Sequence, residues 1–319
     1  MTALLLLTAG LALLAFGGDA LVRGATALAR FAGVTPAVIG LTVVAMGTSA
    51  PELAVSLLAA ARRQPDIAVG NVIGSNIFNI AGILALTAIA TPFPVRGSVV
   101  RLEWPVMFVV TVFALLFMRD GEFGRLEGLG FTVALVAFIA YTVRLARAEV
   151  RGAEARAFEH QAETRSIPSR WREIGVAVAF VGVGIVMLAG GGQLLVAGAV
   201  RIARLLGMTE RVIGLTIVSV GTSMPELAAS IAAARRRETD VAVANVIGSN
   251  IFNLLGILAL TAIYRPIPIN HALVASDGWW MLATSLLVFP LLRSGLRLTR
   301  FEGSLLFAAY LVYVLLLLR

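Results

Sequence analysis

Ten long apolar segments, separated by short polar connections, make up most of the chain. They lie near residues 1–17, 37–61, 67–92, 104–118, 128–146, 173–200, 212–234, 241–264, 279–292 and 303–318. Most are long enough to cross a bilayer as a helix of about 20 residues, whereas those near 104–118 and 279–292 need flanking residues to do so. Because lipid offers the backbone no hydrogen-bond partners, spanning segments of this kind are predicted to be helices. The pattern therefore predicts an all-α, polytopic membrane protein with about ten transmembrane helices.

The chain also contains an internal duplication, in which each element recurs 174 residues later. GLTVVAMGTSAPELAVSLLAA begins at Gly40 and GLTIVSVGTSMPELAASIAAA at Gly214, while NVIGSNIFN occurs at 71–79 and again at 245–253. Of the 40 residues that begin at Gly40, 28 are identical in the second copy. Five apolar segments separate an element from its copy, and this odd number means that the second half enters the membrane in the opposite direction. We therefore expect two inverted five-helix repeats, an architecture whose binding sites lie where the repeats meet.

The duplication sets the expected division of the chain. Residues 1–146 form the first repeat, 147–171 a linker and 172–319 the second repeat. The linker is rich in Arg and Glu, which predicts a short amphipathic helix or a solvated tether. GGDALVRGATALAR at 17–30 pairs with GGQLLVAGAVRIAR at 191–204. The N-terminal segment is therefore expected to belong to the fold and not to be a cleaved signal peptide.

Composition and charge narrow the class of protein. Hydrophobic residues make up 59% of the chain and charged residues only 14%, which argues against a soluble enzyme or a disordered chain. The absence of cysteine excludes disulfides and thiolate metal sites. All 26 basic residues are Arg, and they lie mostly between apolar segments, a pattern typical of membrane orientation and not of nucleic-acid binding. The positive-inside rule places the N-terminus outside and both the 147–171 linker and the 235–240 turn in the cytoplasm.

Two acidic residues, Glu52 and Glu226, lie inside apolar segments with apolar neighbours on both sides. A carboxylate at membrane depth costs several kcal/mol unless it is compensated. No Arg lies in the facing segments to form a structural ion pair, so each Glu is predicted to be a cation ligand or a proton carrier. Pro51 and Pro225 precede them, cannot donate a backbone hydrogen bond and displace the carbonyl four residues earlier. We expect each helix to break there and to turn free carbonyls toward a cavity.

Oxygen-bearing side chains accompany both glutamates. The GTSxPE motifs contribute four hydroxyl residues: Thr48, Ser49, Thr222 and Ser223. Two stripes of polar residues with a spacing of four contribute the others: Asn71, Ser75 and Asn79 in the first repeat, and Asn245, Ser249 and Asn253 in the second. Residues spaced by four share one helix face, and such oxygens suit hard ions such as Ca²⁺ and Na⁺. Each Ser or Thr has an alternative, a hydrogen bond back to its own helix. Each stripe helix also has small residues, Gly70 and Gly74 or Ala244 and Gly248, that let helices touch.

Other polar residues near these segments have less defined roles. Asn76 and Asn250 lie off the stripes and are expected to pack or to form hydrogen bonds. Asp66 and Asp240 precede the stripe helices and are predicted to be helix N-caps, with a vestibule that attracts cations as the alternative. Asp19 has no acidic counterpart in the second repeat, so symmetry does not require a charge there, and a place at a helix end is expected.

At these residues the chain resembles the sodium/calcium exchangers of the cation/calcium antiporter family, in the prokaryotic form without a regulatory loop. The resemblance rests on GTSxPE and GSNxxN in each half and extends over the whole chain. It implies that Glu52 and Glu226 are the acidic ligands at the centre of the site, and that Ala45 and Ser219 supply backbone carbonyls for sodium. It also implies ligand roles for hydroxyl and amide side chains, namely Thr48, Ser49, Ser75, Asn79, Thr222, Ser223, Ser249 and Asn253.

The resemblance further implies a transporter and not an enzyme. The expected activity is secondary active antiport, in which Na⁺ is exchanged for Ca²⁺ by alternating access and Ca²⁺ is normally extruded. Both ions bind as substrates in the plasma (inner) membrane of a prokaryote, with no cofactor, no nucleic acid and no obligate protein partner. Some relatives carry Asp where this chain has Asn253, and that Asp is linked to potassium co-transport. Asn253 therefore argues against potassium dependence.

Three alternatives stay open at this point. The same Glu pair can carry protons in an H⁺/Ca²⁺ antiporter, because burial favours a protonated carboxyl, although the hydroxyl-rich motif fits sodium better. A membrane-embedded hydrolase needs a base beside its Ser or Thr, and no His, Lys or Asp lies at membrane depth near them. A channel is the third alternative, and inverted broken helices around a closed cluster favour a carrier over it.

Overall fold

The structure is a computed structural model that describes the whole chain except residues 1, 159–169, 206, 208–218 and 318–319. The described part is almost entirely helical, as predicted. Within it, eight helices are long and apolar enough to cross a membrane, and a bent pair, Pro36–Thr48 with Ala50–Ala61, adds a ninth. The tenth span predicted near 212–234 begins among residues outside the described part.

The first repeat consists of one long helix, a broken span, a buried span and two outer helices. α1 (Thr2–Ala32) leads into α2 (Pro36–Ile39), the π-helical segment η1 (Gly40–Val44), α3 (Ala45–Thr48) and, after a bend, α4 (Ala50–Ala61). A tight turn reverses the chain into α5 (Pro65–Ile77), the π-helical segment η2 (Phe78–Leu84) and α6 (Ala85–Ala90). The outer part follows as η3 (Val99–Glu103), α7 (Trp104–Phe117), η4 (Met118–Asp120) and α8 (Arg125–Phe158).

In its described part, the second repeat has the same order of elements. α9 (Arg170–Leu205) corresponds to α1, and α11 (Ser219–Thr222) with α12 (Met224–Arg235) corresponds to α3 and α4. The buried span recurs as α13 (Thr239–Phe252), η6 (Asn253–Leu258) and α14 (Ala259–Tyr264). The outer part recurs as α15 (His271–Leu273), η7 (Val274–Gly278), α16 (Trp279–Arg293), η8 (Ser294–Leu296) and α17 (Arg300–Leu317). The duplication predicted from the sequence is therefore confirmed in three dimensions.

Two short antiparallel strand pairs join the repeats. β1 (Phe93–Pro94) pairs with β4 (Arg297–Leu298), and β2 (Glu122–Phe123) pairs with β3 (Ile267–Pro268). Each pair takes one strand from each repeat, so the backbone itself links the two halves. The sequence did not predict these strands, because two residues are too few for an alternating hydrophobic pattern.

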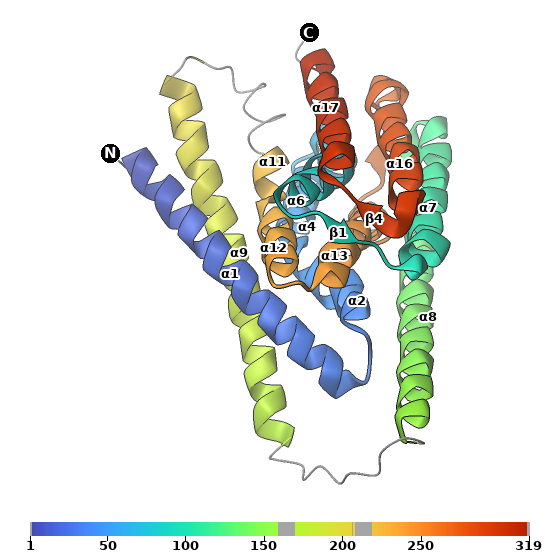
Figure 1. The fold of residues 1–319 in the computed structure, drawn as a ribbon. Coiled ribbons are helices and arrows are strands. Elements are labelled where there is room, and N and C mark those ends of the chain that lie inside the picture. Colours follow the sequence, from blue (N-terminus) through green and yellow to red (C-terminus); the bar gives the residue numbers. More distant parts are fainter. Residues whose placement is uncertain (1, 159–169, 206, 208–218, 318–319) are drawn as a thin grey trace.

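α1 and α9 lie side by side as a crossing pair at one edge of the molecule (Figure 1). Glycines allow their backbones to touch. A Cβ on Gly24 would lie 2.7 Å from the carbonyl oxygen of Ala177, and one on Gly184 would lie 2.6 Å from the amide nitrogen of Leu21. Small residues at such contacts are typical of helix pairs in membranes. The pair is therefore a packed unit that flanks the rest of the molecule.

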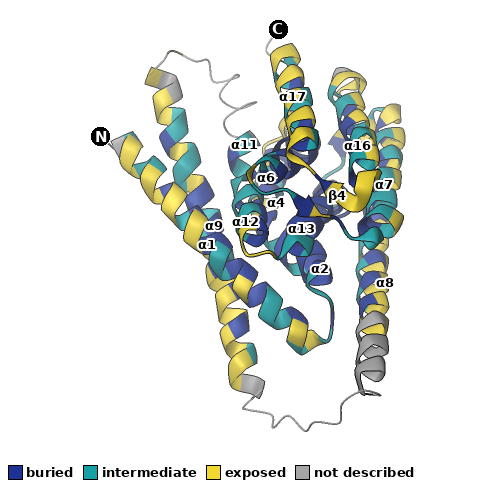
Figure 2. Cartoon of the chain, in the orientation of Figure 1, coloured by how far each residue is buried: buried dark blue, intermediate teal, exposed yellow. Residues whose placement is uncertain are grey.

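Burial separates the helices into a buried centre and a lipid-exposed exterior. In Figure 2, α13 is dark blue, whereas α1, α8, α9 and α17 are yellow along their outer faces. The exposed faces carry large apolar side chains, among them Leu5, Val133, Val186, Phe301 and Leu315. Exposed apolar surface of this extent fits a protein whose solvent is lipid.

The predicted linker is partly helical. α8 runs to Phe158, so residues 147–158 continue the last helix of the first repeat instead of leaving it at 146. α9 begins at Arg170, just before the predicted start of the second repeat. Residues 159–169 lie outside the described part.

A candidate cation centre between the repeats

The two GTSxPE motifs break their helices where the sequence predicted. Ser49 separates α3 from α4 with φ −83° and ψ 9°, and the helix bends by 44° there. Ser223 separates α11 from α12 with φ −89° and ψ 7°. Pro51 and Pro225 each lie in the first helical turn after the break, where a missing N–H costs nothing. The prolines thus allow a new helix to start in the middle of each span.

Glu52 and Glu226 come together behind these breaks, and each is only 1% exposed. The hydroxyl of Ser223 donates to Oε1 of Glu52 over 2.8 Å, and that of Ser49 donates to Oε1 of Glu226 over 2.7 Å. Each glutamate is thus held by the serine of the opposite repeat. Neither carboxylate has an ion-pair partner among the described residues, so the alternative of a structural Glu–Arg pair does not apply to them.

The first residue of each stripe joins the two helices of its hairpin, α4–α5 or α12–α13, by hydrogen bonds. The Asn71 amide donates to the backbone carbonyl of Glu52 over 3.0 Å and to the Ser56 hydroxyl over 2.9 Å. In the second repeat, Asn245 makes the matching bonds, at 3.4 Å to the carbonyl of Glu226 and 3.0 Å to the hydroxyl of Ser230. These bonds fasten α5 to α4 and α13 to α12. Ser56 and Ser230 were not predicted to take part, although each lies one helical turn after its glutamate, on the same face.

The other stripe residues complete the buried cluster. Ser75, Asn79, Ser249 and Asn253 are at most 1% exposed, and the hydroxyls of Ser223 and Ser75 are 3.2 Å apart. α12 packs against η2, and α4 packs against η6, so each asparagine's π-helical segment faces the opposite repeat's glutamate helix. π-Helical segments inside α-helices occur frequently at functional sites. The structure therefore brings the two motifs of both repeats into one centre.

Five buried oxygens of this cluster have no hydrogen-bond partner among the described residues. They are Oε2 of Glu52, Oε2 of Glu226, Oδ1 of Asn79, Oδ1 of Asn253 and Oγ of Ser249. Burying a polar oxygen without a partner costs about 1–3 kcal/mol, and more for a charged group. A cation is the ligand that satisfies several acceptor oxygens at once, so the cluster has the chemistry of a site for a hard ion.

The four remaining predicted ligands do not contribute to the five unpartnered oxygens. Thr48 donates to the carbonyl of Val44 over 3.0 Å, which is the helix back-bond weighed as its alternative, and lies 3.4 Å from Oδ1 of Asn245. Ala45 accepts from the Ser49 amide over 3.0 Å. Thr222 is partly buried at the end of α11. Ser219 begins α11, and its side chain lies outside the described part.

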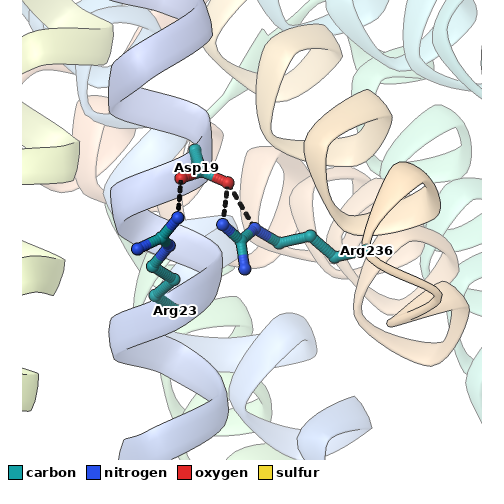
Figure 3. Close-up of polar contacts among 3 residues, drawn as sticks. All are labelled: Asp19, Arg23 and Arg236. Carbon is teal, nitrogen blue, oxygen red and sulfur yellow. Dashed lines mark hydrogen bonds and ion pairs between the residues drawn. The ribbon is translucent and has the colours of Figure 1, made fainter.

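The helix-end prediction for Asp19 and the N-cap predictions for Asp66 and Asp240 were wrong. Asp19 lies in the middle of α1 and not at a helix end, where it pairs with Arg23 at 3.0 Å and with Arg236 (Figure 3). Asp66 and Asp240 lie in the first turns of α5 and α13, but other residues, Gln64 and Glu238, hold the N-cap positions. A carboxylate in the first turn still interacts favourably with the helix dipole, which explains the misplaced assignment.

Comparison with known proteins identifies the family to which the chain is similar. The family model described as sodium/calcium exchanger protein matches residues 2–144 and 176–319. The chain is 39% identical to CaxA of Alkalimonas amylolytica over 320 residues, which cover 99% of both proteins. It is 38% identical to the inner membrane protein YrbG of Escherichia coli, over 98% of this chain and 95% of YrbG.

A solved structure agrees with these matches. The sodium–calcium exchanger NCX_Mj, soaked with Na⁺ and Ca²⁺, superposes with a TM-score of 0.82 at 30% identity and covers 98% of each chain. The chain spans nearly the whole length of each of these proteins, so the likeness includes both repeats. The chain therefore belongs to the sodium/calcium exchanger family and is an integral membrane transporter of the cation/calcium antiporter type.

Proposed function

We propose that the chain exchanges Na⁺ for Ca²⁺ across the membrane by alternating access, and that it normally extrudes Ca²⁺. The observation that carries the proposal is the buried cluster at the contact between the repeats, where two glutamates, two asparagines and a serine contribute five unpartnered oxygens. Secondary transporters with inverted repeats bind their ions at this place. The exchange of sodium and calcium by NCX_Mj supports the same activity for this chain.

The ligand roles follow from the chemistry of each oxygen. Glu52 and Glu226 supply a formal charge of −2, and the partnerless carbonyl oxygens of Asn79 and Asn253 supply neutral ligands. Hydroxyls and backbone carbonyls complete the proposed set: Thr48, Ser49, Ser75, Thr222, Ser223 and Ser249, with the carbonyls of Ala45 and Ser219 for sodium. Ca²⁺ takes six to eight oxygen ligands in flexible geometry, which a set of this size accommodates.

Charge balance makes calcium and sodium mutually exclusive substrates. One Ca²⁺ neutralises the two carboxylates, and so do Na⁺ ions, but both together would leave excess positive charge in a low-dielectric centre. An empty centre leaves two buried carboxylates uncompensated, which is also unfavourable. Only a filled centre is therefore expected to let α1 and α9 slide past α4, α5, α12 and α13 and open the other side.

The sodium gradient sets the direction of net transport, and the Arg distribution predicts how the chain lies in the membrane. The Arg-rich connections support an N-terminus outside and a 147–171 linker in the cytoplasm of a prokaryotic cell. The inward sodium gradient then drives Ca²⁺ outward through the plasma (inner) membrane. The proposal needs no cofactor and no protein partner.

Flux measurements on the purified protein test this proposal. Proteoliposomes loaded with sodium, or with protons at low pH, are diluted into buffers with and without the matching gradient, and uptake of radioactive calcium is followed. Uptake that needs the sodium gradient supports the proposal. Uptake that follows only the pH gradient would assign the chain to H⁺/Ca²⁺ antiport and make both glutamates proton carriers.

Replacing Pro51 with alanine is expected to weaken calcium binding while the protein still folds. Alanine restores the N–H that proline lacks and removes the ring that displaces the carbonyl of Gly47, so α3 and α4 can join into one straighter helix. The apparent affinity for calcium should fall about tenfold in a binding titration. Pro105→Ala is the matched control, because Pro105 also lies in the first turn of its helix, α7, but belongs to neither GTSxPE motif. An unchanged affinity in Pro51→Ala would argue against the broken helix as a source of ligands.

A further inference from the structure

Two buried asparagines outside the proposed ligand set face the ligand asparagines from the opposite repeat. Nδ2 of Asn253 donates to Oδ1 of Asn76 over 3.0 Å, and Nδ2 of Asn79 donates to Oδ1 of Asn250 over 2.9 Å. Asn250 in turn donates to the backbone carbonyl of Asn76 over 3.2 Å. All four side chains are at most 1% exposed. The bonds therefore form a reciprocal bridge of amides between α5–η2 and α13–η6.

The bridge decides which end of each ligand amide faces the ions. An asparagine side chain presents either an oxygen or an NH₂ group, and the two ends exchange by a half-turn of the amide. Asn76 offers its oxygen to the nitrogen of Asn253, so the oxygen of Asn253 points away from the bridge and has no partner among the described residues. Asn79 is held in the same way by Asn250. A cation needs the oxygen end, because the NH₂ group repels it.

We propose that Asn76 and Asn250 are positioning residues, each of which orients the ligand asparagine of the other repeat toward the ions. The proposal rests on the cation centre of the proposed function. It also gives the sequence motif a physical meaning: in GSNxxN, the first Asn of one copy orients the last Asn of the other copy. A purely structural role, in which the four amides only hold the helices together, makes a different prediction.

A double-mutant cycle separates the two roles. Asn253→Asp replaces the amide by a carboxylate whose two oxygens are equivalent, so its orientation no longer matters. Asn76→Leu is then expected to weaken calcium binding about tenfold in the wild-type background but less than about twofold in the Asn253→Asp background. Calcium affinity is measured by isothermal titration of the purified protein, and thermal unfolding is recorded for each variant.

Every outcome of this cycle bears on the proposal. An equal loss of affinity in both backgrounds, or no loss in either, would overturn it. If Asn76→Leu does not fold, Asn76→Ser replaces it, because serine is smaller and cannot reach the Asn253 nitrogen; failure of both variants to fold would show a structural role. A wild-type protein that does not bind calcium would instead refute the proposed function, so the two failures are distinguishable.

A second feature, the charged contact between α1 and the α12–α13 turn, distinguishes the two repeats. Asp19 on α1 accepts from Arg23 one helical turn later and from Arg236 at the end of α12 (Figure 3). α1 packs closely here, since a Cβ on Gly18 would lie 2.9 Å from the carbonyl oxygen of Ala228. The ion pairs therefore fasten α1, one member of the crossing pair, to the glutamate-bearing hairpin of the second repeat.

The symmetry-related positions carry no such contact. The counterparts of Asp19 and Arg23, 174 residues later, are Gln193 and Ala197, while Arg236 corresponds to Arg62. The proposed side-chain ligands, in contrast, are identical in pairs between the repeats. If the repeats exchange conformations during alternating access, the ligands themselves favour neither state. A bias between the two states must then come from residues outside the centre.

We propose that the Asp19–Arg236 pair is a latch that favours the conformation seen in this structure over its opposite. In the opposite conformation, position 193 takes the place of position 19 against Arg62, and Gln193 provides no charge to hold it. The ion pair is partly exposed, so its effect on the ratio of the two states is modest, about threefold. The latch rests on alternating access by the proposed function.

Exchange of the two residues tests the latch. In sealed vesicles of known orientation, the half-saturating calcium concentration is measured at each face. Asp19→Gln should change the ratio of these two concentrations about threefold, and adding Gln193→Asp should move it further in the same direction, because the new carboxylate faces Arg62 in the opposite state. A ratio that stays constant in both variants, or that Gln193→Asp returns to the wild-type value, would overturn the latch. Absence of exchange in the wild-type protein would refute the proposed function instead.

Discussion

Replacing either Glu52 or Glu226 with glutamine is expected to abolish calcium transport without unfolding the protein. The change lowers the formal charge of the centre from −2 to −1, so that a bound Ca²⁺ leaves one positive charge uncompensated in a water-poor environment. Removing one partner of a buried charge pair typically costs about 3–5 kcal/mol, which corresponds to a loss of affinity of about a hundredfold or more. Calcium uptake into sodium-loaded proteoliposomes measures this loss.

The two variants should be equally impaired, because the surroundings of the two glutamates match. Each carboxylate accepts from the serine of the opposite repeat, and each is as deeply buried as the other. Glutamine keeps an oxygen that can accept the serine hydrogen bond, so the fold is expected to survive. Glu127→Gln is the matched control, since Glu127 lies in the first turn of α8 and is only partly buried. Normal uptake in either Glu52→Gln or Glu226→Gln would refute the assignment of that glutamate as a ligand.

The elements of the centre were predictable because each rests on a local property of the sequence. A glutamate between apolar residues, a proline before it and a stripe with a spacing of four can each be read within one helix. The duplication also predicted that the two sets of polar residues lie together, because they must meet if the repeats pack face to face. The helices break at Ser49 and Ser223, as the prolines that follow them predicted.

The pairing between the repeats was not predictable in the same way. Nothing in the sequence tells that Ser49 serves Glu226 and not the nearby Glu52, because this depends on how the two hairpins cross. The bridge between Asn76 and Asn253 has the same origin. Packing or hydrogen bonds were expected for Asn76, and the structure confirms the hydrogen bonds, but its partner Asn253 lies 177 residues away.

The ion pair of Asp19 was also not predictable from the sequence. Its neighbours in the sequence give no sign of its main partner, Arg236, which lies 217 residues later. The lack of an acidic counterpart in the second repeat was visible from the start, but it was taken only as evidence that the charge is dispensable. Under the proposed latch, the same asymmetry favours one of the two transport states over the other.

Replacing Gly248 with alanine is expected to destabilise the protein strongly. Gly248 lies on α13 where η1 crosses it, and a Cβ there would lie 2.5 Å from the carbonyl oxygen of Leu41 and 2.8 Å from its Cα. Both are backbone atoms, which cannot move aside as a side chain can. The added methyl group must therefore push η1 away from α13. This contact confirms the small-residue seam predicted at Ala244 and Gly248, since Ala244 likewise faces Gly40 of η1.

The cost of this displacement is measurable as thermal stability. Overpacking of a close contact typically costs about 1–3 kcal/mol, which lowers the melting temperature of a protein of this size by about 5 °C. Gly182→Ala is the matched control, because a Cβ on Gly182 of α9 meets no atom within 4 Å. Because η1 leads directly into the broken helix of Glu52, Gly248→Ala should also weaken calcium binding, whereas Gly182→Ala should not. Equal melting temperatures for the two variants would show that η1 and α13 are not in close contact, and the packing that places Glu52 opposite the second repeat would have to be revised.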